Sequence, residues 1–93
     1  MADSFEWKDF SRYVEVHPVR TGWLVVWGRY TDAGAKKHIE GNRTYPDLTA
    51  ARHRVADAAM ELTHKTSLAQ EALQRFDRFT FPQHEPIERP EPL

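Results

Sequence analysis

A stripe of metal-binding residue types lies on the predicted C-terminal helix. His53, Asp57, Glu61 and His64 follow one another at intervals of three or four residues, which places them on one helical face. Imidazole and carboxylate groups at such spacings can bind zinc or nickel. The same face lies opposite the apolar positions of the helix, so it points toward water, where nothing shields a metal or orients its ligands. We therefore expect a solvated helix face, with no metal site and no cofactor.

Nucleophilic catalysis has little support in the sequence. The chain has no cysteine, and no Gly-x-Ser-x-Gly motif surrounds Ser4, Ser11 or Ser67, none of which has an obvious neighbouring base. The four glycines are scattered singly instead of forming a phosphate-binding loop. We therefore predict a protein that is not an enzyme.

Basic side chains gather beside aromatic ones on two predicted neighbouring strands. Cations among stacking aromatic rings on a sheet are typical of proteins that bind single-stranded nucleic acid. However, 13 Lys and Arg are balanced by 14 Asp and Glu, whereas nucleic-acid-binding domains usually carry a basic excess. The alternative interpretation is core aromatics, with lysines that protect an edge strand from pairing. Nucleic-acid contact is thus possible without being favoured, and its candidate residues are Arg29, Lys36, Lys37 and Arg43.

The chain length and composition predict one cytoplasmic domain. Ninety-three residues suit a single domain. The absence of cysteine fits a reducing compartment, and the N-terminal residues lack the basic and apolar regions of a signal peptide. No apolar run approaches the roughly 20 residues that a membrane-spanning helix needs.

The second of three predicted strands is apolar on both faces. The predicted strands cover residues 12–18, 23–30 and 36–45, and short turns between them favour an antiparallel meander with the second strand in the centre. Because side chains alternate along a strand, Trp23 and Trp27 share one face, and Leu24 and Val26 share the other. We expect the tryptophan face to meet an Ala-rich helix. The opposite face needs another cover, such as the N-terminal aromatic arm at residues 1–11, the aromatics after Phe76, or a second subunit.

One apolar stripe continues from residue 48 to residue 76. Apolar residues recur at intervals of seven, and Asp47 is placed to cap the helix. A single helix of this length would extend about 45 Å, beyond the end of a strand of about 26 Å. Either the chain breaks near residues 63–67 and folds back, or the overhang packs on a second copy. The sequence leaves both alternatives open.

The last twelve residues differ in composition from the rest. Residues 82–93 contain four prolines, which favour an extended or disordered tail, with Ile87 as an anchor if the tail docks. We therefore predict one α+β domain at residues 1–81, followed by this tail.

Part of the chain resembles a known kind of domain. Val16-His17-Pro18, Gly22-Trp23 at the start of a strand, and Arg43-Thr44-Tyr45 before an Ala-rich helix are similar to small bacterial β-β-β-α domains of unknown function. The resemblance covers about residues 12–62. It implies a fold and brings no catalytic residues.

These observations predict a three-stranded antiparallel meander packed on one long C-terminal helix, with a break near residues 63–67 as the alternative. The expected function is that of a non-enzymatic protein–protein interaction module, as a homodimer. The other candidate functions are a phage or mobile-element accessory protein that docks on a nucleic-acid-handling complex, and a direct single-strand binder. The predicted partner-binding residues are Trp23, Trp27, Leu73 and Phe76.

Overall fold

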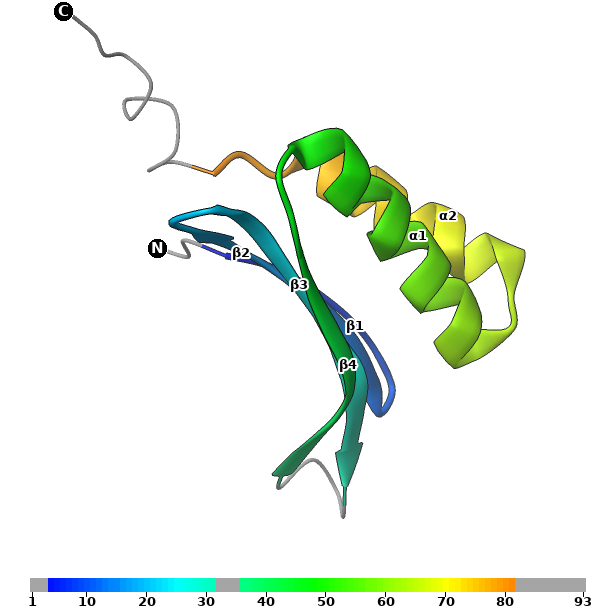
Figure 1. Cartoon of the computed structure of the whole chain (residues 1–93). Helices are drawn as coiled ribbons and strands as arrows, with labels where there is room; N and C mark the ends of the chain where they lie inside the picture. The colour runs from blue at the N-terminus through cyan, green and yellow to red at the C-terminus, as the bar shows by residue number, and fades with distance from the viewer. Residues whose placement is uncertain (1–3, 32–35, 82–93) are drawn as a thin grey trace, which may run out of the picture.

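Four strands and two helices make up the domain. The computed structural model describes residues 4–31 and 36–81. The four strands form one antiparallel sheet in the order β1-β2-β3-β4, and both helices cover the same face of it (Figure 1). The predicted α+β class is confirmed, whereas the number of strands and the number of helices differ from the prediction. The elements are β1 (Phe5–Asp9), β2 (Arg12–Val19), β3 (Gly22–Thr31), β4 (Lys36–Tyr45), α1 (Leu48–Thr63) and α2 (Thr66–Arg78).

The expected N-terminal arm contains a strand, β1, at the edge of the sheet. Phe5 pairs with Val16 and Trp7 with Val14, so the strand runs antiparallel to β2. Its residues alternate between buried aromatics and exposed charged side chains, which is the period of a strand. The prediction of three strands was wrong because pairing with β2 buries both aromatic rings at once, and a short loose arm could not.

The long apolar stripe is divided between two helices that fold back on each other. His64, in the left-handed conformation at φ 59°, ends α1, and its N–H donates to the carbonyl of Met60 at 2.7 Å. The Thr63 hydroxyl donates to the carbonyl of Ala59 at 2.7 Å and accepts from the Lys65 N–H at 3.2 Å. Side-chain hydrogen bonds thus stabilise the break without Gly or Pro. The prediction of a single long helix was wrong, and the alternative of a break near residues 63–67 is confirmed: α2 packs beside α1 instead of extending beyond the sheet.

The start of α1 follows the sequence expectation. Asp47 has extended backbone angles, and its carboxylate accepts the Ala50 N–H at 2.8 Å. This is the usual geometry of an aspartate N-cap. Further along the helices, Arg52 of α1 and Asp77 of α2 form a two-point ion pair at 2.7 and 2.8 Å, which holds the two helices side by side.

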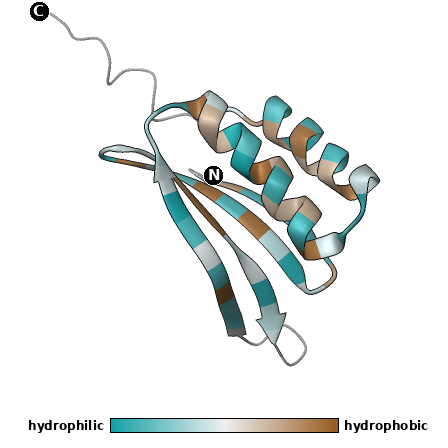
Figure 2. Cartoon of the chain, turned by 45° about the vertical axis from the view of Figure 1, so that its right-hand side comes forward, coloured by the Kyte–Doolittle hydropathy of each residue, from teal (hydrophilic) through white to brown (hydrophobic). Residues whose placement is uncertain are grey.

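The core lies between the helices and one face of the sheet. Trp23 and Val25 point toward the helices, as predicted, and Trp27 packs at the margin of the same cluster. Small helical residues leave space for these rings, and apolar residues, brown in Figure 2, recur along both helices and along the strands that they cover. Within the described residues, no helix is long and apolar enough to cross a membrane. The buried core residues are Phe5, Trp7, Val14, Val16, Trp23, Val25, Ala51, Val55, Ala58, Ala59, Leu62, Ala69, Ala72, Phe76 and Phe81.

A bulge interrupts the pairing of β3 with β4. Trp27 lies opposite Gly41, but the next residue, Gly28, lies opposite Ile39. A side chain at Gly41 would overlap the Trp27 ring, whose Cε2 lies 2.7 Å from the position of an added Cβ. The Trp27 ring therefore lies directly against the backbone at Gly41.

Candidate functional site

The sheet face turned away from the helices carries a chain of hydrogen bonds between polar side chains. We call this face the open face. Ser4 Oγ lies 2.7 Å from His17 Nδ1, and His17 Nε2 lies 2.9 Å from Glu15 Oε1. The ammonium of Lys37 completes the chain by donating to the other oxygen of Glu15. The open face is defined by Glu6, Lys8, Tyr13, Glu15, His17, Leu24, Val26, Tyr30, Lys37 and Ile39.

The hydrogen bonds around Glu15 change the ionisation of two groups. Burial alone would raise the pKa of Glu15, but hydrogen bonds from Lys37 and His17 outweigh it, and the pKa of Glu15 is lowered. The same contact raises the pKa of Lys37, because its charged form is stabilised by the carboxylate. Glu15 is therefore ionised at neutral pH, although it is 8 % exposed.

Ser4, His17 and Glu15 contain the residue types of a nucleophile, a base and a carboxylate. No base for Ser4 was evident in the sequence, and the pairing of β1 with β2 is what places His17 beside it. In nucleophilic triads, the carboxylate stabilises the imidazolium that forms when the base takes the proton. Here Lys37 already neutralises Glu15, so the carboxylate is poorly placed for that role. These hydrogen bonds instead connect β2 to β4 and to Ser4, the residue that precedes β1.

An aromatic and cationic cluster covers the next part of the open face. The rings of Tyr13 and Tyr30 lie 5.2 Å apart, Lys8 Nζ lies 4.5 Å from the Tyr30 ring, and Lys37 Nζ lies 5.0 Å from the Tyr13 ring. Burial raises the pKa of both tyrosines, and for Tyr30 the hydrogen bond that it donates to Glu6 at 3.0 Å adds to this. Side chains of the sheet itself thus shield much of the open face, which the sequence predicted to need a cover.

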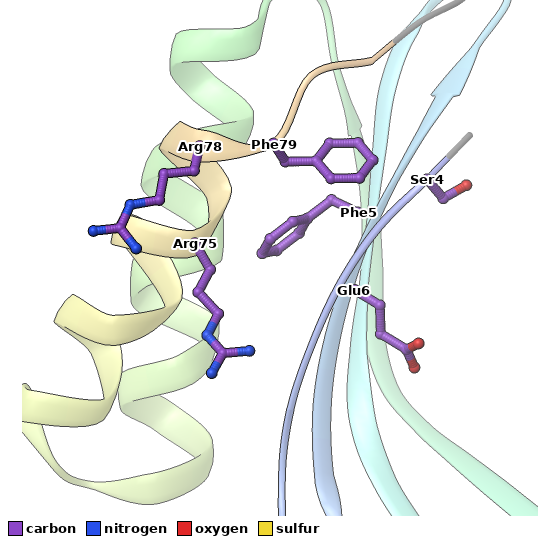
Figure 3. A pocket seen from close by; sticks show the side chains of 6 residues that line it. All are labelled: Ser4, Phe5, Glu6, Arg75, Arg78 and Phe79. Atoms are coloured by element: carbon purple, nitrogen blue, oxygen red, sulfur yellow. The ribbon is translucent and has the colours of Figure 1, made fainter. Parts of the chain in front are cut away.

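A pocket lies between the start of β1 and the end of α2. In this pocket, Phe5 lies between α2 and the sheet, with its ring 5.1 Å from Phe76 and 5.8 Å from Phe79 (Figure 3). Two arginines of the last turn of α2, Arg75 and Arg78, flank these rings. The pocket is lined by Ser4, Phe5, Glu6, Arg75, Arg78 and Phe79.

A second pocket lies at the other end of β1, beside the connection between α1 and α2. It includes Phe10, which follows β1, has a positive φ of 53° and is 89 % exposed, the most exposed of the large apolar side chains of the described residues. The two pockets thus lie at opposite ends of β1. We call them, with the outer side of β1, the β1 groove. The second pocket is lined by Asp9, Phe10, Ser11, Arg12, Thr63, Lys65 and Leu68.

The four residues predicted to bind a partner occupy different environments. Trp23 and Phe76 are 4 % and 5 % exposed and belong to the core of the chain. Trp27 is half-buried, with the guanidinium of Arg54 4.4 Å from its ring centre. Leu73 is half-buried on α2. The burial of Trp23 and Phe76 removes them from the surface of the folded monomer.

The predicted nucleic-acid contacts lie on both faces of the sheet. The strand register places Arg29 and Arg43 on the helix side, and Lys37 on the open face. Arg29 pairs with Glu40 at 2.7 Å, and Lys37 pairs with Glu15. Lys36 begins β4. The structure therefore does not bring these residues together on one surface.

The metal-binding residue types on α1 remain on its exposed face. His53, Asp57, Glu61 and His64 are all exposed, and Glu61 pairs with Arg54 at 2.6 Å. Among the residues that the structure describes, no group of three or more His, Cys, Asp or Glu side chains is arranged to hold a metal ion.

Comparisons of this chain with protein-family models, with curated proteins and with solved structures found no match. Function is therefore inferred from the geometry of the chain itself. Sequence reasoning missed the β1 groove, although the alternation of Phe5, Glu6, Trp7 and Lys8 was a readable strand signal.

Proposed function

We propose that this chain is a non-enzymatic protein–protein interaction module that binds its partner by strand addition at β1. The observation that carries the proposal is the β1 groove. An outermost strand presents unpaired backbone N–H and C=O groups, which a partner strand can bind. A pocket with an aromatic side chain at each end of the strand supplies places for side chains of the incoming strand.

The other edge of the sheet is less suited to strand addition. The bulge opposite Trp27 and Gly28 disrupts the regular pairing of β4. A bulge is one of the features that protect an edge strand from pairing, whereas exposed charged side chains are present on both edge strands, β1 and β4. β1, by contrast, keeps one continuous register with β2.

The positions of the basic residues favour a protein partner over nucleic acid. A nucleic-acid surface needs several cations on one face, so that they neutralise neighbouring phosphates. Arg29 and Lys37 lie on opposite faces of the sheet, and each already pairs with a carboxylate. The single-strand-binding alternative therefore gains no support from the geometry.

Selection of binding peptides tests the proposal. A displayed library of random peptides would be selected on the full chain, and the amides that the selected peptides protect from hydrogen exchange would be mapped. We expect protection of β1, and loss of binding when a polyethylene glycol is attached to Lys8→Cys. The same label on Thr44→Cys in β4 is the matched control, since the chain has no native cysteine. Peptides that protect β4 or the open face, and are indifferent to the label at position 8, would contradict the proposal.

A further inference from the structure

The sequence of β1 is complementary to itself when two copies run antiparallel. We infer that the partner of the β1 groove is a second copy of this chain, paired through β1 about a twofold axis at Trp7. This inference rests on the proposed function and names the occupant of the same groove. The two sheets would join into one antiparallel sheet, with the helices of both copies on the same side, because directly opposite residues share a face.

The charges of the open face select this register. With the axis at Trp7, Glu6 lies opposite Lys8 of the second copy, and Lys8 lies opposite its Glu6. Moving the axis to Glu6 would place Glu6 against Glu6, and moving it to Lys8 would place Lys8 against Lys8. Opposite charges across a strand pair stabilise it and like charges destabilise it. A shift of the axis by half a residue would place Trp7 opposite Lys8, so that outward-pointing backbone groups of one strand would face inward-pointing ones of the other and the ladder could not form.

The helix side of the groove is complementary in the same register. Asp9 of the second copy lies opposite Phe5, whose pocket is flanked by Arg75 and Arg78 (Figure 3). Its carboxylate would therefore face the pocket that Arg75 and Arg78 line, where Arg75 pairs with Glu71 at 3.4 Å in the monomer, and it would keep its own Arg12 at 3.4 Å. Charges on both faces of β1 thus favour one arrangement.

The exposed Phe10 side chain would also be covered in this dimer. Phe10 of the second copy lies at the level of Ser4, at the pocket that contains Phe5 and Phe79. In the monomer the Phe10 ring is 89 % exposed, which is unfavourable for an aromatic side chain. Covering it against the half-buried Phe79 would add apolar contact at both ends of the strand pair, because the axis repeats every contact.

Charge reversal at one position and then at both tests the register. The mass of the wild type would be measured by sedimentation equilibrium from micromolar to millimolar concentrations, and we expect association to twice 10.9 kDa. Glu6→Lys or Lys8→Glu should each weaken association at least about tenfold, because two like-charge contacts replace two opposite-charge contacts. The double variant should recover wild-type association. A mixture of the two single variants should form a mixed dimer, because both cross-strand contacts between positions 6 and 8 then join opposite charges.

Two controls separate the register from effects on folding. Asp57→Lys reverses a charge on the exposed face of α1 and should leave association unchanged. Glu6→Cys mixed with Lys8→Cys should give a disulfide between chains more rapidly than either variant alone, and this readout does not depend on charge.

The outcomes are distinct for the two proposals. A wild type that remains at 10.9 kDa overturns the second copy as occupant. A dimer that is indifferent to both reversals overturns it as well. If selected peptides still bind at β1 in either case, strand addition survives with another partner. Rescue in the double variant and in the mixture supports the Trp7-centred pair.

Discussion

Two glycines in the β3–β4 hairpin should differ sharply in their tolerance of alanine. At Gly28, an added Cβ would overlap the carbonyl oxygen of His38 and lie 3.0 Å from the amide nitrogen of Glu40. Both neighbours are backbone atoms at the bulge, so neither can move without opening the strand pair. At Gly41, the Cβ would meet the Trp27 ring instead, with its Cε2 atom at 2.7 Å. Ordinary contacts between carbon atoms lie at about 3.5–4.0 Å, so both substitutions require movement.

The expected loss in the free energy of unfolding depends on which atoms each added Cβ displaces. Overpacking alone costs about 1–3 kcal/mol, and loss of one or two ladder hydrogen bonds at the bulge adds about 1 kcal/mol each. Gly28→Ala should therefore lower the free energy of unfolding by about 2–5 kcal/mol. The half-buried Trp27 ring can shift toward solvent, so Gly41→Ala should cost about 1–2 kcal/mol. Alanine's lower entropic cost in a strand offsets part of each loss, by about 0.5–1 kcal/mol.

Urea-induced unfolding followed by far-ultraviolet circular dichroism measures both variants without relying on Trp27 fluorescence. The free energies come from linear extrapolation to water, with the slope compared between variants to check that the unfolded state is unchanged. A Gly28→Ala variant within about 1 kcal/mol of wild type would refute the reasoning from the bulge. A larger loss for Gly41→Ala than for Gly28→Ala would refute it as well.

Two further substitutions probe the charged pairs. Glu15→Gln should lower the free energy of unfolding at neutral pH by about 1–2 kcal/mol, because Lys37 and His17 lose a charged acceptor. Since the folded-state pKa of Glu15 is lowered from 4.5, its contribution is complete above that value and is lost as the pH falls through the folded-state value. The difference from wild type should therefore shrink at pH values below the ordinary carboxyl range, and a difference that grew in acid would contradict this sign. Asp77→Asn should cost less than about 1 kcal/mol, because its ion pair with Arg52 lies at the surface. The loss should diminish in high salt, and chemical denaturation at low and high ionic strength measures it.

The alternation of side chains along a strand allowed one strand to be predicted correctly and was not sufficient for another. Trp23, Val25 and Trp27 were expected on the helix side, and they are there, because the small alanines of α1 leave space for rings of that size. The same alternation was present in Phe5–Asp9, but that segment is short. Its identity as a strand depends on a partner, β2, that accepts it in register. A five-residue segment has no stable strand structure by itself.

At the break between α1 and α2, the sequence pattern favoured a structure that the chain does not adopt. The apolar stripe keeps its phase through Thr63 and His64, so periodicity favours continuation. Intrinsic propensity at these residues is only weakly against a helix. The chain turns because α2 can then bury Ala69, Ala72 and Phe76 against elements of the same chain. That energetic gain is tertiary, and no local pattern contains it.

Local patterns were sufficient for the α+β class, the cap at Asp47, and the division of β3 into a tryptophan face and an aliphatic face. These features depend on interactions within a few residues or on strict alternation, so they can be read from neighbouring positions. Only the assembled fold decided that residues 5–9 form the strand β1, that the chain folds back at His64 instead of continuing as one helix, and that the β1 groove exists. Each of these depends on segments far apart in the chain meeting in one register. The surface that we propose for binding exists only because β1, the first strand, and α2, the last helix, border the same edge of the sheet.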